Sequence, residues 1–151
     1  MTPVATLVRA VLLAVALAGF SPEGASAQGN RWERRVADEL RRASGTLRLK
    51  GFARPQATRI GPLNNEESES FAVTLEAGVS YALIGVCDND CSRLELVLAT
   101  ATRSELAAAR ASENVPFLQF TPRQTMSYRV KAVMAACRMN PCWYGVGVYG
   151  K

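Results

Sequence analysis

Hydrophobic residues recur along this chain with two different periods. Near the N-terminus they fall four, four and three residues apart, at Trp32, Val36, Leu40 and Ala43. This spacing places them on one face of an amphipathic α-helix. Asn30 followed by Glu33 is typical of a helix start, and Gly45 is typical of a helix end.

After Gly45 the period becomes two, which is typical of β-strands. The alternating or continuously apolar runs are 47–49, 71–75, 79–87, 94–98, 128–134 and 144–148. Residues 79–87 are apolar nearly throughout, as in a strand that is covered on both faces. Frequent turn residues between short strands predict an antiparallel β-sandwich or barrel.

Two segments are harder to assign from pattern alone. Arg54 to Ser68 contains turn residues and is expected to form a flexible loop. Residues 103–111 are rich in alanine and favour helix by local propensity, whereas their surroundings favour a sheet. We expect a turn and a short edge strand there.

The first residues have the organisation of an export signal. Arg9 precedes an apolar run from Ala10 to Phe20, and Ala25-Ser26-Ala27 supplies a small-x-small cleavage site. The run is shorter than the roughly 20 residues that a membrane span needs. We therefore expect a cleaved signal peptide (1–27), an N-terminal helix (28–45) and one sandwich domain (46–151), with no stable membrane insertion of the mature chain.

The amino-acid composition restricts the catalytic and metal-binding chemistry that the chain can support. Histidine is absent, which removes the usual general base, the usual metal ligand and the ordinary Ser/His and Cys/His catalytic pairs. The net charge of +5 is compatible with an anionic partner and equally with simple solubility. Export and an unclustered basic excess argue against nucleic-acid binding. No cofactor is expected.

The four cysteines predict two disulfides in an exported chain of this size. Cys87 and Cys91 flank one turn, and Cys137 and Cys142 flank another. Opposed positions beside a tight turn have Cα atoms near the separation that a disulfide requires. We favour these two local pairs, which would fix hairpin geometry, over the two crossed pairings.

Two metal sites are weaker alternatives. Four thiolates could bind zinc, although an oxidising compartment argues against reduced cysteines. Asp88 and Asp90 could bind calcium with backbone carbonyls, but Arg93 lies nearby and such loops usually gather more carboxylates. The competing interpretation is a hairpin tip in which the aspartates cap their own backbone.

Six segments of the chain follow a familiar pattern of spacing and hydrophobicity: Phe71–Tyr81, Gly85–Cys91, Leu94–Leu98, Val115–Pro122, Tyr128–Val130 and Cys137–Val146. In these segments the chain resembles bacterial pre-peptidase C-terminal (PPC) domains, of the stand-alone exported variety that carries cysteines. The resemblance implies a jelly-roll-type β-sandwich and an accessory role beside secreted hydrolases. Arg93 and Glu95 replace family aspartates, which weakens any calcium inference.

These observations favour an exported, non-catalytic binding or accessory module of the envelope or secretome. Its partner would be an envelope or secreted protein or a glycan, held on a sandwich face or by the loops. The candidate contact residues are Trp143, Tyr149 and Trp32, since exposed rings bind sugars and protein partners; Tyr144 is expected in the core. A purely structural protein, or a calcium- or glycan-binding domain, is the alternative.

An enzyme is the least favoured class. Glu66, Glu67 and Glu69 form an acidic cluster that could supply the two carboxylates of a glycosidase. A solvated loop is the commoner explanation of such a run. There is also no Gly-x-Ser-x-Gly elbow and no phosphate-binding loop.

Overall fold

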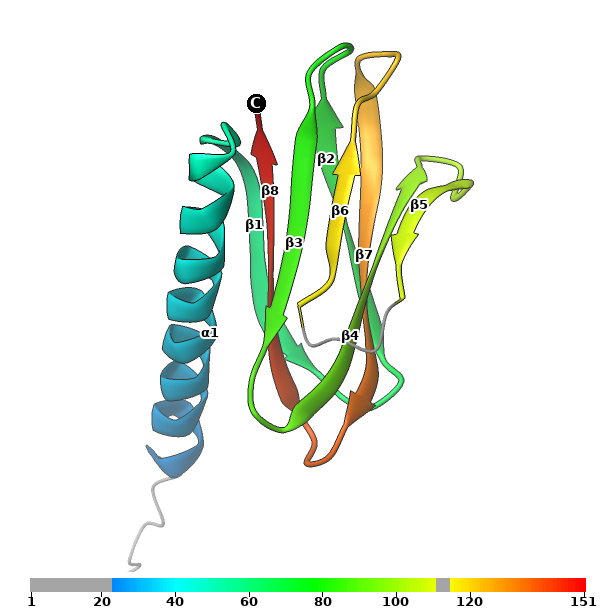
Figure 1. Cartoon of the computed structure of the whole chain (residues 1–151). Helices are drawn as coiled ribbons and strands as arrows, with labels where there is room; N and C mark the ends of the chain where they lie inside the picture. Colours follow the sequence, from blue (N-terminus) through cyan, green and yellow to red (C-terminus); the bar gives the residue numbers. More distant parts are fainter. Residues whose placement is uncertain (1–22, 111–114) are drawn as a thin grey trace, which may run out of the picture.

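The computed structural model describes the backbone of residues 23–110 and 115–151, with side chains from Arg31 onward. Within these residues, one helix and eight strands follow one another (Figure 1). They are α1 (Glu23–Leu49), β1 (Arg54–Leu63), β2 (Ser68–Leu75), β3 (Tyr81–Cys87), β4 (Cys91–Thr100), β5 (Glu105–Ala109), β6 (Phe117–Phe120), β7 (Met126–Cys137) and β8 (Cys142–Gly150). Most of the predicted signal peptide, residues 1–22, lies outside the described residues. Within the described part, no helix has the length and apolar character needed to cross a bilayer.

The strands form two four-stranded antiparallel sheets that pack face to face. Sheet A has the order β1-β8-β3-β6, and sheet B has the order β2-β7-β4-β5. This alternation between sheets is the strand order of a jelly roll, so the predicted fold class is confirmed. Every ladder in both sheets is antiparallel.

Period-two alternation fills the core between the sheets. Leu94, Leu96 and Leu98 on β4 and Val130 and Met134 on β7 are fully buried. Each large apolar side chain taken from water contributes roughly 2 kcal/mol. Every residue of β3 is buried, as its continuous apolar sequence predicts, because α1 covers the other face of that strand.

Helix α1 lies along the outer face of sheet A, where it packs on β8, β3 and β1 (Figure 1). Glycines on β8 allow this approach. A Cβ atom on Gly145 would lie 2.8 Å from Val36 of the helix, and one on Gly147 would lie 2.6 Å from the ring of Tyr149. Gly145 therefore receives a side chain of the helix, and Gly147 receives the ring of Tyr149 from its own strand, rather than another backbone.

The helix is longer than predicted at both ends and continues through Gly45. The prediction of a strand at 47–49 is wrong. Leu47 extends the helical stripe and is only 4% exposed, whereas Leu49 points to solvent and is 90% exposed. Gly45 is exposed, and its penalty of about 1 kcal/mol within a helix is smaller than the gain from burying Leu47.

The prediction of a flexible loop at 54–68 is also wrong, because β1 pairs with β8 along most of this segment. As an edge strand β1 tolerates Pro55 and Pro62, since only one side of it needs ladder hydrogen bonds. A register shift between Pro55 and Ala57 breaks the alternation that would have identified the strand.

The predicted edge strand within 103–111 is confirmed. Among the described strands, β5 pairs with β4 alone and ends sheet B. Local helix propensity is overridden because Ala107 and Ala109 pack against the core.

Substitution of Gly145 tests the contact between helix and sheet. Gly145→Ala should lower the free energy of unfolding by about 1–3 kcal/mol, because the new Cβ displaces the buried Val36 side chain. Gly45→Ala is the matched control. Nothing lies within 4 Å of that position, so the variant should be as stable as wild type or up to about 1 kcal/mol more stable. Urea unfolding measures the stability of both variants. Equal stability of the Gly145 variant and wild type would contradict the close contact between Gly145 and Val36.

Candidate functional site

Three connections pass between the two sheets at the same end of the sandwich: 64–67, 88–90 and 138–141 (Figure 1). We call this the disulfide end, because Cys87–Cys91 and Cys137–Cys142 close two of these connections, each with Cα atoms 5.9 Å apart. Both favoured local pairings are therefore present. Each links sheet A to sheet B rather than two strands of one hairpin, and Cys91 lies opposite Cys137 in the β4–β7 ladder.

The carboxylate of Asp88 holds the first of these turns. Oδ1 accepts hydrogen bonds from the backbone N–H groups of Asp90 and Cys91, both at 3.2 Å. Oδ2 accepts one from the N–H of Trp143 at 2.7 Å. Asp88 is buried, so its charge is balanced by these donors rather than by solvent. It thereby joins the 88–90 turn to the start of β8.

Hydrogen bonds also tie the other two connections together. Asn65 donates from its backbone to Asn140 Oδ1 and accepts from the N–H of Cys137, each at 2.8 Å. Arg138 donates from its backbone to the carbonyl of Asp90 at 2.8 Å and from its guanidinium to the carbonyl of Asn89. The three connections consequently form one rigid surface.

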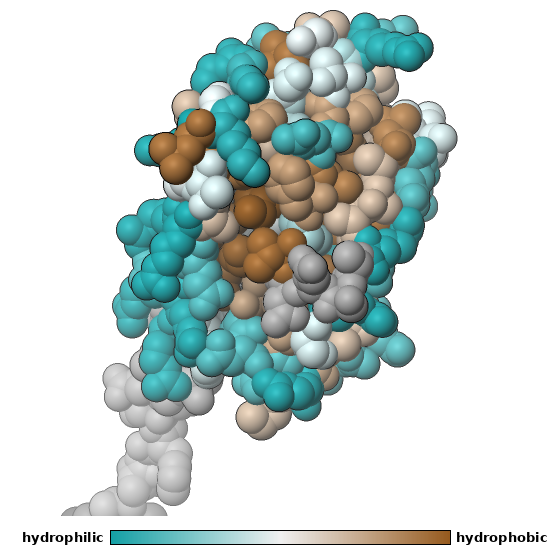
Figure 2. Space-filling model, viewed as in Figure 1, coloured by the Kyte–Doolittle hydropathy of each residue, from teal (hydrophilic) through white to brown (hydrophobic). Residues whose placement is uncertain are grey.

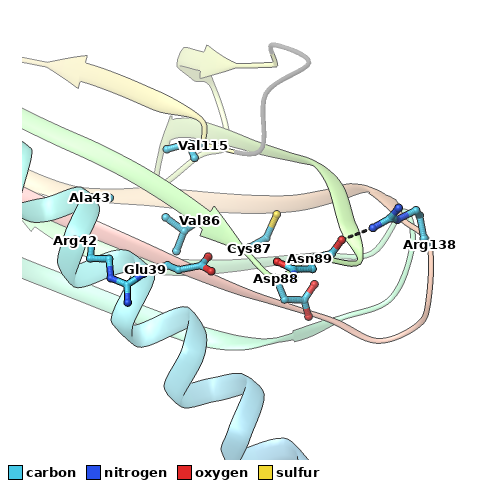
Figure 3. Close-up of a pocket in the computed structure, with 9 residues that line it drawn as sticks. All are labelled: Glu39, Arg42, Ala43, Val86, Cys87, Asp88, Asn89, Val115 and Arg138. Atoms are coloured by element: carbon cyan, nitrogen blue, oxygen red, sulfur yellow. Dashed lines mark hydrogen bonds between the residues drawn. The ribbon is translucent and has the colours of Figure 1, made fainter.

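A groove of about 610 Å³ opens between this end of the sandwich and the helix. Figure 3 shows Glu39 and Arg42 projecting from α1, with Arg138 on the turn at the opposite side. The groove is lined by Glu39, Arg42, Ala43, Val86, Cys87, Asp88, Asn89, Val115 and Arg138. Arg35 donates to Asn89 Oδ1 at 3.0 Å and so links the helix to the 88–90 turn.

The charges of the groove are unequally satisfied. Glu39 pairs with Arg35 at 3.6 Å, and Asp88 is occupied by backbone donors. Arg42 and Arg138 have no ion pair within residues 31–110 and 115–151. Two guanidinium groups are thus the charges left for a partner.

An exposed apolar side chain, Val115, lines the groove and is 46% exposed. Phe117, two residues further along the chain, is 40% exposed. Figure 2 shows hydrophilic residues on the outside of the helix, with hydrophobic residues gathered beside it over the strands. Val115 is placed by Pro116, which packs on Gly85 of β3, where a Cβ atom would lie 2.8 Å from the proline ring.

The aromatic residues predicted to contact a partner do not form an exposed platform. Tyr149 is buried beneath the helix at 8% exposure, which corrects its assignment as a contact residue. Trp143 is partly buried against the same cluster, and Trp32 carries Arg31 and Arg35 over its ring at 5.4 and 5.8 Å. Tyr144 is fully buried, as expected.

The geometry bears on both metal alternatives. All four cysteines are in disulfides, so the thiolates that zinc requires are not present. Asp88 caps backbone N–H groups, as the competing interpretation of the turn predicts. Across the described ranges, no group of three or more potential metal-ligating side chains comes together.

The acidic cluster forms structural contacts. Tyr144 donates to Glu69 Oε2 at 2.7 Å, and Arg59 pairs with Oε1, so Glu69 joins β2 of sheet B to β1 and β8 of sheet A. Burial acts to raise the pKa of Glu69, but hydrogen bonds from Tyr144 and Arg59 outweigh it and hold that pKa below its ordinary value. Burial and the Glu69 carboxylate raise the pKa of Tyr144. Glu67 instead accepts from the backbone of Asn64.

Several residues that line the groove were not predicted from the sequence as contact residues. Arg42 belongs to a basic helix face, and Arg138 belongs to a turn between cysteines, so each has a local explanation. The signal that could have drawn attention to Arg138 is its position between two cysteines. Nothing in the sequence places it at one groove with Arg42.

No protein-family model and no curated protein sequence matches the chain. Among solved structures, it is similar to the pre-peptidase C-terminal domain of a collagenase from Bacillus anthracis. The identity is 13%, the TM-score is 0.48, and 62% of this chain and 88% of that chain are covered. It is also similar to PliG of Aeromonas hydrophila, a periplasmic inhibitor of g-type lysozyme, at 9% identity and a TM-score of 0.45, covering 66% and 89%. Both similarities concern the fold alone.

Removal of the Asp88 carboxylate should weaken the disulfide end. Asp88→Ala leaves the N–H groups of Asp90 and Trp143 without acceptors, whereas the N–H of Cys91 keeps the backbone carbonyl of residue 88; the free energy of unfolding should fall by about 2–4 kcal/mol. Asp90→Ala is the control, since no hydrogen bond from its side chain is found among the described residues; we expect a change within about 0.5 kcal/mol. Denaturant unfolding of the two oxidised variants measures these changes. Equal losses of stability in the Asp88 and Asp90 variants would contradict the role of the Asp88 carboxylate as an acceptor.

The contacts of Glu69 should make part of the free energy of unfolding sensitive to acid. Its pKa is lower in the folded state, so its contribution is complete above about pH 4.3 and is lost as the pH falls through the folded pKa. Glu69→Gln should lower the free energy of unfolding by about 1 kcal/mol at pH 7, and this difference should shrink on acidification. Unfolding curves between pH 7 and pH 2.5 test this, and a difference independent of pH would contradict it.

Proposed function

We propose that this chain is an exported, non-catalytic accessory module that binds a protein partner at the groove beside the disulfide end. The observation that carries the proposal is that the groove has a rigid edge, formed by the disulfide end, and two arginines without ion pairs. Arg42 and Arg138 are left without ion pairs among the described residues, on a surface tied by two disulfides and Asp88. A preformed site loses little conformational entropy on binding.

The residues around the groove favour a protein over a neutral glycan. Arginine beside exposed apolar side chains is typical of protein interfaces. Val115 supplies an apolar contact, and the guanidinium of Arg42 and the remaining N–H groups of Arg138 supply donors for acidic side chains. Neutral sugars are usually held on exposed aromatic rings, whereas here Tyr149 is buried and Trp32 and Trp143 are only partly exposed. The partner is therefore expected to present an acidic segment with a neighbouring apolar residue.

Export is part of the same proposal. The N-terminal signal pattern and the two disulfides both support an oxidising compartment outside the cytosol. In such a setting a purely structural role is the second candidate. It is favoured by the rigidity of the disulfide end and predicts no partner.

A charge reversal in the groove tests the proposal. The mature oxidised protein, immobilised, is exposed to the extracytoplasmic proteins of its native host, and retained proteins are identified and purified. Arg42→Glu should reduce retention of the partner about tenfold, because it opposes an acidic segment. Arg48→Glu carries the same charge change on the same helix, but Arg48 does not line the groove, so retention should be unchanged.

The purified partner is then titrated against all three proteins by calorimetry. A partner bound equally well by the Arg42 variant would contradict the groove as the site. Retention of nothing would favour the structural role, and a retained species that resists protease would contradict a protein partner.

A further inference from the structure

The outer faces of the two sheets differ in what covers them. Helix α1, the one helix of the described chain, packs on sheet A. The outer face of sheet B, which we call the bare face, carries exposed Ser70, Ala72, Ser127 and Lys131. A hollow of about 420 Å³ lies on it, and its lining includes Ser68, Ser70, Ala99, Arg103, Arg129 and Lys131. The bare face is polar, so it needs no cover to keep the fold stable.

The strand register places the charged side chains of the bare face next to small residues on the neighbouring strands. Lys131 on β7 lies between Ser70 and Val97, and Arg129 lies between Ala72 and Ala99. Residues two apart on a strand are separated by about 7 Å and share one face. Two cationic side chains therefore project side by side from a floor of small residues.

Most cations of the hollow are unpaired. Arg110 is engaged, since it donates twice to Glu105, once at 2.9 Å. Arg103, Arg129 and Lys131 form no ion pair with any described residue. With Glu105 neutralised by Arg110, the hollow presents three free positive charges.

Arg129 is also incompletely satisfied. Its Nε atom is buried and is without a hydrogen-bond partner in the part of the chain that the structure describes. A buried donor without an acceptor is unfavourable and calls for an explanation. An oxyanion that draws the Arg129 side chain outward into the hollow would supply the missing acceptor.

Arg103 occupies an unusual backbone conformation. It has φ of 68° in the turn between β4 and β5, a region where glycine is favoured. A turn that would be less strained with glycine nevertheless carries an arginine whose side chain lines the hollow. Strain retained at such a position is typical of functional residues.

We infer that the bare face binds an anionic polysaccharide. Spaced cations and the hydroxyl groups of Ser68 and Ser70 suit a chain that carries both carboxylates and sugar hydroxyls. None of the described residues that line the hollow is aromatic, so they offer no stacking platform of the kind that neutral sugars and nucleobases use. This site lies on the sheet opposite to the helix and is independent of the groove.

Polygalacturonate is the probe, with neutral dextran of similar length as its control. The mature oxidised protein should bind polygalacturonate, should bind more weakly as NaCl is raised, and should not bind dextran. The double variant Arg103→Gly with Lys131→Gln should bind about tenfold more weakly. Glycine relieves the strained turn, so Arg103→Gly alone should unfold at the same or a higher urea concentration than wild type while losing affinity.

Matched controls separate this site from net charge and from the groove. Arg34→Gln with Arg48→Gln removes the same charge from exposed helix positions and should leave the affinity for polygalacturonate unchanged. Arg42→Glu should leave it essentially unchanged as well. The inference is overturned by absence of binding, by equal losses in both double variants, or by tighter binding of an oligodeoxynucleotide at the same salt concentration.

Discussion

Three connections cross between the sheets at one end of this sandwich, and the rest of the molecule depends on their being tied together. Cys87–Cys91 and Cys137–Cys142 close two of them, and Asp88 joins one turn to the start of β8. Small disulfide loops contribute only about 2 kcal/mol each through chain entropy. Their larger effect is geometric, because they hold the rim of the groove in a single arrangement.

The second constraint is the unequal character of the two sheets. Sheet A is apolar on both faces, so it requires α1 as a cover, and glycines on β8 let that cover approach closely. Sheet B buries its large apolar side chains in the core, and its outer face carries Arg129 and Lys131 among smaller residues, which leaves that face available to solvent and ligands. One sheet thereby provides a groove against its helix, and the other provides an open basic surface.

Much of the fold could be predicted because burial imposes simple periods. Alternation located β2, β4, β7 and β8, and continuous hydrophobicity located β3 as a strand covered on both faces. The periodicity gave a wrong prediction at two places. Gly45 does not end the helix, because burial of Leu47 stabilises the next turn by more than the glycine destabilises it. In β1 a register shift breaks the alternation of buried and exposed residues. The disulfides followed from local spacing. The groove did not, because Arg42, Asp88 and Arg138 meet only through the jelly-roll order of strands.

Export in an oxidised state underlies both proposed surfaces, and one measurement tests it most directly. The protein is recovered from its native host without reductant and mapped by peptide mass spectrometry. We predict a chain that begins at Gln28, with peptides linking Cys87 to Cys91 and Cys137 to Cys142. A chain that retains its leader and carries four free thiols would contradict the account.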